Sequence, residues 1–207
     1  LKYDKSIKIF YTGENKRPNF NVADYAISFD CMTFEDRHLR VPLYKLFKYR
    51  TGLDLALNRK KLVLSDISKR KFCNFVVSNL GQSSDERYSI LTRLNKYQTV
   101  DCGGRVLNNV GGPVKDKLAF QRQYKFSVAF ENSSHNGYCT EKIVQAFAAG
   151  TIPIYWGDPT IAKQFNSRAF INCHDYNSFD AVIERVKGLD VDHDRLLDTL
   201  NEPVGVK

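Results

Sequence analysis

The stretch YKFSVAFENSSHNGYCTEKIVQAFAAGTIPIYWGD, residues 124–158, decides the fold. It opens on an apolar run at 126–130, which is typical of a buried strand. Mostly polar residues follow at 131–139, and apolar positions then recur at helical spacing over 140–150, ending on a glycine where helices commonly stop. A second apolar run at 152–156 again indicates a strand. Strand, loop, helix and strand in this order predict a βαβ unit with parallel strands.

The loop inside this unit is the first candidate for a binding site. It is longer than the usual connection of about 2–6 residues, and ligands bind at the carboxyl ends of parallel strands. It leads to Glu141 and Lys142 in the first turn of a helix, where unpaired backbone amides and the helix dipole favour a phosphate. A lysine in that position is better explained if an anion binds, and the neighbouring carboxylate could accept bonds from sugar hydroxyls. A surface ion pair beside an N-capping Thr140 is the alternative, and these residues alone leave both open.

Two segments resemble a known enzyme family. The motif FENS…GYCTEKI…AGTIPIYWGDP, beginning at Phe130, is similar to the signature of the α-1,3/4-fucosyltransferase family, usually written FENS…DYVTEK…G…P…G. The segment FYTGENKRPNF at 10–20 resembles the family's acceptor-side segment, and that of bacterial members most of all. VVSN at 76–79 and Arg87 fall where the family has the first donor-domain strand and an arginine. The resemblance covers most of residues 7–190.

The resemblance implies roles for individual residues. The family counterpart of Glu14 is the base that deprotonates the acceptor hydroxyl, and the counterparts of Lys142 and Arg87 hold the diphosphate. The guanidinium of an arginine can grip phosphate oxygens in a bidentate way. The family often has an aspartate where this chain has Gly137, which leaves that position without an assigned role. The resemblance also implies donor-binding roles for Asn132, Tyr138 and Glu141, and supporting roles around them for Glu131, Ser133 and Thr140.

The fold that the resemblance implies is α/β, with two Rossmann-like domains of a B-type glycosyltransferase and the N-terminal one incomplete in this chain. We expect residues 1–70 to be the remaining part of an acceptor-side domain with a basic linker. Residues 71–190 are then the GDP-fucose domain, and 191–207 a C-terminal helix and tail. The chain begins with Leu, and family members have a substantial segment before the FYTGEN-like stretch, so we expect it to be a piece of a longer protein.

The element boundaries follow from local patterns. Residues 51–71 are polar, basic and weakly periodic, which predicts a linker. Asp158 followed by Pro159 predicts an N-cap and a helix over 159–165. The sequence DVD at 190–192 could hold a metal, but its polar setting before the last helix favours a helix start. Further expectations are strands over 7–11, 24–30, 72–78 and 170–173, a helix from Ser178 to Gly188 and a last helix over about 192–200.

Composition and charge restrict the setting. Hydrophobic residues make up 43% of the chain and no apolar run approaches the roughly 18–20 residues that span a bilayer. Five cysteines are spread singly and the N-terminus lacks the apolar core of a signal peptide, which favours a reducing compartment. The net charge is +8, and residues 37–71 alone carry +9, from eleven Lys or Arg and two Asp, so the rest of the chain is close to neutral. We therefore expect a bacterial cytoplasmic protein with peripheral contact to the anionic inner membrane, and no nucleic acid partner, since no recognition motif accompanies the charge.

The leading hypothesis is an inverting transferase that moves fucose from GDP-fucose to the 3-hydroxyl of N-acetylglucosamine in a lactosamine-type glycan. The linkage, the donor and the acceptor come from the resemblance, which also implies that no metal and no cofactor is required. Two alternatives stay open at this stage. One is a nucleotide-sugar-binding fragment without turnover, and the other is a basic module for nucleic acid or a membrane surface.

Overall fold

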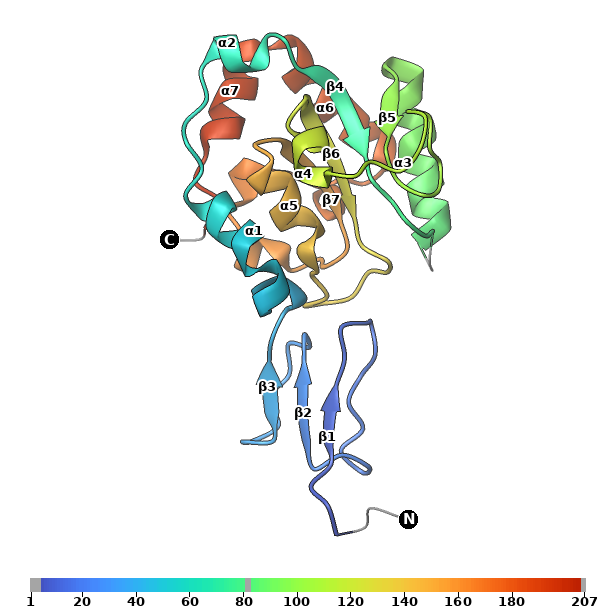
Figure 1. Cartoon of the computed structure of the whole chain (residues 1–207), viewed down its shortest axis with the longest axis vertical. Coiled ribbons are helices and arrows are strands. Elements are labelled where there is room, and N and C mark those ends of the chain that lie inside the picture. The colour runs from blue at the N-terminus through green and yellow to red at the C-terminus, as the bar shows by residue number, and fades with distance from the viewer. Residues whose placement is uncertain (1–4, 81–82, 206–207) are drawn as a thin grey trace.

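The computed structural model describes residues 5–80 and 83–205, and it contains two parallel β-sheets (Figure 1). The smaller sheet has the strand order β1-β2-β3, and the larger has the order β5-β4-β6-β7-β8. All neighbouring strands in both sheets are parallel, which confirms the α/β class. The strands are β1 (Ile9–Tyr11), β2 (Tyr25–Ser28), β3 (His38–Arg40), β4 (Lys71–Phe75), β5 (Val100–Cys102), β6 (Tyr124–Phe130), β7 (Ile152–Trp156) and β8 (Ile171–Asn172).

The predicted βαβ unit lies at the centre of the larger sheet. β6 and β7 pair in parallel from Phe126 opposite Ile152 to Phe130 opposite Trp156. The helix between them, α5 (Glu141–Ala148), is followed by Gly150 with φ of +68°, the left-handed conformation that a glycine adopts readily after a helix. The prediction for this unit is therefore confirmed, including the position where the helix ends.

Helices cover both faces of the larger sheet, as a parallel sheet requires. On one face, α3, α6 and α7 surround an aliphatic core that includes Ile90, Leu94, Val186 and Leu196, all fully buried. On the other face, α1 and α5 pack around a second cluster that contains Phe147. The helices are α1 (Phe47–Leu57), α2 (Leu64–Ile67), α3 (Ser84–Tyr97), α4 (Lys117–Gln121), α5, α6 (Phe179–Val191) and α7 (His193–Asn201).

Several strand bounds differ from the predictions by a few residues, and α6 continues to Val191, beyond the end predicted at Gly188. Two elements differ more strongly. The supposed linker at 51–71 contains most of α1 and all of α2, and α1 packs against α5 through Leu53 and the buried Ala56. Two contact residues are too few to give a helical period in the sequence. The helix expected over 159–165 is only a short 3₁₀ turn, Ile161–Lys163. The helix is short because Oδ1 of Asp158 accepts a hydrogen bond from the backbone amide of Thr160 at 2.8 Å, which favours a tight turn.

The capping predictions near the C-terminus are confirmed. Ser178 accepts a bond from the amide of Ala181 and begins α6. Asp192, the last residue of the DVD sequence, accepts a bond from the amide of Arg195 and begins α7. A helix N-cap thus accounts for that carboxylate.

The three-stranded sheet has one uncovered face. Its register places Ile9 beside Tyr25, and Tyr11 and Leu39 beside Ile27, so these side chains share one side. Ile9, Tyr11, Tyr25 and Leu39 are between 42% and 61% exposed, and we call them the exposed apolar face. In Figure 1 this sheet lies below the larger domain, near the loop between β6 and α5. No helix of the described ranges covers the exposed apolar face.

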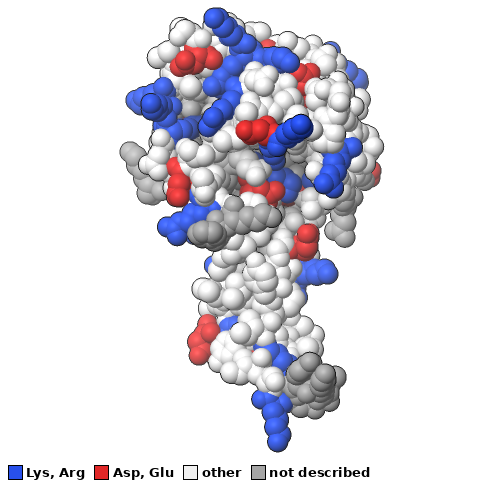
Figure 2. Space-filling model, in the orientation of Figure 1, with Lys and Arg blue, Asp and Glu red and all other residues white. Residues whose placement is uncertain are grey.

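A basic groove lies at the other end of the molecule, near the amino ends of β4 and β6. Figure 2 shows Lys and Arg gathered at the end where α2 lies. Two adjoining cavities there, of about 570 and 420 Å³, share Arg70 and Arg122. The cations of the basic groove are Arg59, Lys60, Lys61, Lys69, Arg70, Lys71 and Arg122. In the part of the chain that the structure describes, no helix is both long and apolar enough to cross a bilayer.

Candidate active site

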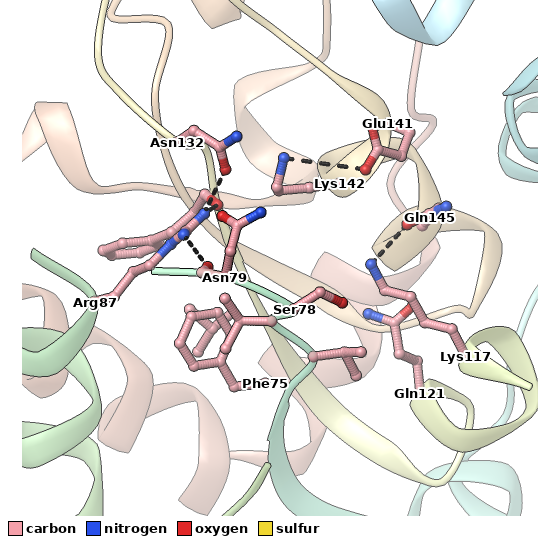
Figure 3. A pocket seen from close by; sticks show the side chains of 14 residues that line it. Phe75, Ser78, Asn79, Arg87, Lys117, Gln121, Asn132, Glu141, Lys142 and Gln145 are labelled. Carbon is pink, nitrogen blue, oxygen red and sulfur yellow. Dashed lines mark hydrogen bonds and ion pairs between the residues drawn. The ribbon is translucent and has the colours of Figure 1, made fainter. Parts of the chain in front are cut away.

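A cavity of about 340 Å³ opens at the carboxyl ends of β4 and β6 (Figure 3). Its walls come from the carboxyl ends of these two strands and the residues after them, from the start of α3, from α4 and from the first two turns of α5. Parallel strands bring their carboxyl ends to one edge of the sheet. Its lining residues are Phe75, Val76, Val77, Ser78, Asn79, Arg87, Lys117, Gln121, Val128, Phe130, Asn132, Glu141, Lys142 and Gln145. Four of the predicted donor-binding residues, Arg87, Asn132, Glu141 and Lys142, therefore share this cavity.

Glu131 organises the start of α5 from below the cavity. Its side chain is fully buried, and its Oε1 accepts the backbone amide of Thr140 at 2.7 Å. Its Oε2 accepts both the hydroxyl of Thr140 at 2.6 Å and the ammonium of Lys142 at 2.8 Å. Thr140 thus donates its hydroxyl to Glu131 and does not cap α5 with it. Supporting roles were predicted for both residues, and these contacts are compatible with such roles.

Lys142 is charged and only partly exposed. Burial lowers the pKa of Lys142, but Glu131 and Glu141 raise it more, so that the net pKa lies above its ordinary value. Its Nζ also lies 2.9 Å from Oγ1 of Thr140 and 4.0 Å from Oε1 of Glu141. The ammonium therefore lines the cavity with its charge partly balanced by protein carboxylates, and a bound diphosphate would share it with them.

Glu141 presents an ionised carboxylate to the same cavity. Burial raises the pKa of Glu141, but Lys142, the residue's own backbone amide and Lys117 together lower it below the ordinary value. A charged acceptor of this kind can take hydrogen bonds from sugar hydroxyls.

Arg87 is fully buried in the cavity wall. Its Nη1 donates to the carbonyls of Asn79 and Leu80 at 2.8 and 2.7 Å, and its Nη2 donates to the carbonyl of Phe130 and to Oδ1 of Asn132. Burial lowers the pKa of Arg87, and the carboxylate of Glu131 raises it in part. Only Nε is buried without a hydrogen-bond partner among the described residues. The arginine thus ties the β4 and β6 ends together, and a bidentate grip on phosphate by both Nη atoms would require these bonds to change.

The loop between β6 and α5 reaches the three-stranded sheet. The hydroxyl oxygen of Ser133 accepts a hydrogen bond from the side-chain Nδ2 of Asn15 at 2.6 Å. The buried ring of Tyr138 packs edge-on against Phe29, with ring centroids 4.8 Å apart. Burial raises the pKa of Tyr138, with Glu131 adding to the shift. Tyr138 does not line the cavity.

Glu14 lies in the loop after β1, next to Asn15. It is exposed, and its backbone amide donates to the hydroxyl of Thr12 at 3.0 Å. The Asn15–Ser133 bond connects this loop to the segment that borders the cavity. The side chain of His135, in the loop between β6 and α5, is 43% exposed, and its Nε2 lies 3.8 Å from Oδ1 of Asp30.

Three polar residues of the cavity that lie on helices were not predicted as site residues from the sequence. Lys117 and Gln121 lie on α4, and Gln145 lies one turn beyond Glu141 on α5. Nζ of Lys117 donates to Oε1 of Gln145 at 2.7 Å, and burial lowers the pKa of Lys117 to about 8. No motif singles these residues out, because they meet at the cavity only through the packing of α4 against α5.

Among the residues described, no group of three or more His, Cys, Asp or Glu is placed to hold a metal ion. The expectation that no metal is required stays a prediction.

Comparison with known proteins gives consistent matches. Residues 67–200 match the family described as "Glycosyltransferase family 10 (fucosyltransferase) C-term", and residues 1–47 match "Alpha-(1,3)-fucosyltransferase FucT N-terminal domain". The chain is 39% identical to the alpha-(1,3)-fucosyltransferase FucT of Helicobacter pylori, over 98% of this chain and 48% of that protein. It thus spans about half the length of that curated relative.

Solved structures agree. A crystal structure of an α1,3-fucosyltransferase with GDP superposes with a TM-score of 0.87 at 38% identity, covering 97% of this chain and 67% of that one. One with GDP-fucose gives a TM-score of 0.81 at 39% identity, covering 96% of this chain and 67% of that one.

Proposed function

This chain belongs to the glycosyltransferase family 10 fucosyltransferases, and from that premise we propose that it binds GDP-fucose and transfers the fucose to a glycan hydroxyl. The observation that carries the proposal is the cavity at the carboxyl ends of β4 and β6, where the charged Lys142 lies in the first turn of α5. An ammonium and a helix start are suited to the leaving diphosphate. The structures of similar proteins with GDP and GDP-fucose support this donor.

The proposed reaction is a single displacement. The acceptor oxygen bonds to the anomeric carbon while the bond from that carbon to the diphosphate breaks, and GDP leaves with the electron pair. The acceptor's proton passes to the carboxylate of Glu14, and the β-linked donor gives an α-fucoside. The acceptor we propose is the 3-hydroxyl of N-acetylglucosamine in a lactosamine-type glycan. Without metal, the charge that develops on the diphosphate is stabilised by Lys142, with Arg87 as a second cation.

Transfer and binding assays test the proposal in order. Isothermal titration should detect GDP binding, and incubation with GDP-fucose and N-acetyllactosamine should then yield a fucosylated product. Binding without product would favour the alternative of a nucleotide-sugar-binding fragment. No binding of GDP would remove the proposed function.

The variant Glu14→Gln tests the base. An amide cannot accept the proton, so we expect transfer to fall by about 10²–10⁴-fold while the affinity for GDP stays within a factor of two. Glu35→Gln, a change at an exposed glutamate in the turn between β2 and β3, is the matched control. Transfer by Glu14→Gln at the parental rate would exclude Glu14 as the base.

We also propose that the basic groove contacts an anionic membrane face, on the cytoplasmic side of a bacterial inner membrane. The seven cations of the groove support this, and so do the aliphatic side chains beside them: Val63 and Leu64 are 57% and 46% exposed. Cations interleaved with exposed aliphatic residues suit a lipid surface, whereas single-stranded nucleic acid sites commonly add aromatic residues for stacking.

A further inference from the structure

The donor cavity has two chemically different sides. In Figure 3, Arg87, Asn132 and Lys142 lie toward one side, and Lys117, Gln121 and Gln145 lie toward the other. The first side carries the start of α5 and the lysine whose pKa is raised. The second side carries the side-chain amides of Gln121 and Gln145, and Nζ of Lys117 donates to Oε1 of Gln145 there.

Gln121 has an unmet hydrogen-bonding requirement. The residue is only 2% exposed, and its buried Oε1 has no hydrogen-bond partner among the described residues although Gln121 lines the cavity. Buried acceptors in folded proteins normally have a donor. A half-turn of the amide about its last side-chain bond would exchange its oxygen and nitrogen, so the group can present an acceptor to a ligand in the cavity.

Lys117 supplies the complementary donor. Its Nζ is fixed by the bond to Oε1 of Gln145, which uses one of its three N–H groups. Phe75, Val77 and Val128 form an apolar part of the same wall. A donor, an acceptor and an apolar surface side by side match a planar base that carries hydrogen-bonding groups on its edge.

We propose that Lys117 and Gln121 read the base of the bound nucleotide, with Lys117 donating to O6 of guanine and Gln121 accepting from its N1–H or 2-amino group. This inference rests on the proposed function, since it takes the cavity to hold GDP-fucose. Adenine presents an amino donor where guanine has O6 and lacks the 2-amino group, so the same two side chains would disfavour it. They therefore determine the choice between guanosine and adenosine diphosphates.

Titration with GDP and ADP tests this inference on the whole chain. The two ligands share ribose and diphosphate and differ only in the base. For Lys117→Met and for Gln121→Met we expect the affinity for GDP to fall at least about tenfold and the affinity for ADP to stay within twofold, because a lost hydrogen bond to a charged or buried group has about this effect. The matched controls are Lys115→Met and Gln123→Met, exposed positions near α4 that do not line the cavity.

The outcomes separate the inference from the proposed function. Parallel losses for GDP and ADP in Lys117→Met would overturn the inference, because they would place this lysine on the shared diphosphate, and unchanged affinities in both variants would overturn it too. A wild-type chain that binds neither nucleotide would overturn the proposed function itself. Thermal unfolding of each variant verifies that it is folded. If Gln121→Met does not fold, the affinities of Lys117→Met for GDP and ADP decide whether the inference holds.

Discussion

The carboxylate of Glu131 is fully buried and accepts three hydrogen bonds at the start of α5. Space for it depends on Gly157, where an added Cβ would lie 2.5 Å from Cγ of Glu131. The cavity's main cation is therefore held by a buried carboxylate that also accepts two hydrogen bonds from Thr140. A bound diphosphate would have to share Lys142 with Glu131.

Lys142→Ala should reduce both stability and donor binding. The change leaves the Glu131 carboxylate buried without its cation, so we expect the free energy of unfolding to fall by about 3 kcal/mol in urea titrations. The affinity for GDP should also fall at least about tenfold. Lys163→Ala, at an exposed lysine, is the control. The double variant Glu131→Gln/Lys142→Met should lose less stability than the sum of its single changes, and full additivity would contradict the coupling.

Lys117→Met should stabilise the ligand-free protein at neutral pH. Burial lowers the pKa of Lys117 from 10.5 to about 8, so its charged form is disfavoured in the folded state. The resulting cost is fully present below pH 8 and disappears as the pH rises from 8 to 10.5, where the folded chain releases the proton before the unfolded chain does. Because the side chain is half-buried, we expect a gain on the order of 1 kcal/mol at pH 7 and almost none at pH 10.5. Urea titrations at both values check it, and an equal gain at both would contradict this account.

At the level of single residues, the sequence was informative where a motif was present. Asn132, Glu141 and Lys142 come from the motif that begins at Phe130, and all three line the cavity. The bonds of Arg87 to backbone carbonyls could not be predicted, because they depend on where two strand ends meet. Lys117 and Gln121 were missed because the sequence does not show that α4 packs against α5 beside the cavity.

At the level of elements, the loop at 131–140 connects the two sheets. It contacts the smaller sheet through Ser133 and Tyr138, and it turns at Gly137 with φ of +88°. A Cβ at this glycine would lie 2.6 Å from the carbonyl oxygen of Phe29 and 2.9 Å from Sγ of Cys31. Gly137 thus allows the loop to approach the smaller sheet closely, which gives a physical reason for a glycine where the family often has aspartate.

Gly137→Ala should separate this contact from simple backbone strain. We expect it to lower the free energy of unfolding by at least about 2 kcal/mol, because the new methyl group meets backbone atoms and the left-handed conformation is also disfavoured. Gly111→Ala is the matched control, since Gly111 has φ of +85° with nothing within 4 Å of the added Cβ. It should cost only about 1 kcal/mol. Equal losses in urea titrations would show that the contact with Phe29 contributes nothing.

Elements were predictable from sequence where they are long and apolar. β6, α5 and β7 have clear apolar patterns, and their type and order were predicted correctly. Residues 51–57 of α1 were assigned to the linker because the leucines of this helix do not share one side: Leu53 packs against the larger domain, whereas Leu55 and Leu57 are 42% and 52% exposed. The short turn after Asp158 was predicted as a helix because proline and a capping residue mark a start without indicating a length.

At the level of the whole molecule, the donor cavity and the basic groove lie at opposite edges of the larger sheet. One is at the carboxyl ends of β4 and β6, and the other is near their amino ends. A membrane bound at the groove would therefore leave the cavity and the smaller sheet directed away from the lipid surface.

Reversing three charges in the groove should abolish binding to anionic vesicles. Each lysine near such a surface contributes about 1 kcal/mol, so Lys60→Glu/Lys61→Glu/Lys69→Glu should weaken binding to phosphatidylglycerol vesicles by about 100-fold or more. Lys96→Glu/Lys187→Glu, outside the groove, is the control in the same co-sedimentation assay. Equal binding to purely zwitterionic vesicles, or stronger binding to RNA than to anionic vesicles, would contradict the proposed membrane contact.

The exposed apolar face affects how measurements on this chain are interpreted. Four large apolar side chains on a short exposed sheet favour association between molecules as a sample is concentrated. Associated molecules would lower the concentration of binding-competent protein in a nucleotide titration. Light scattering at dilute and concentrated protein should therefore precede any determination of stoichiometry. If the titration gives fewer than one bound nucleotide per molecule, that number should be compared with the fraction of monomer. Only a remaining difference would then be attributed to residues of the cavity.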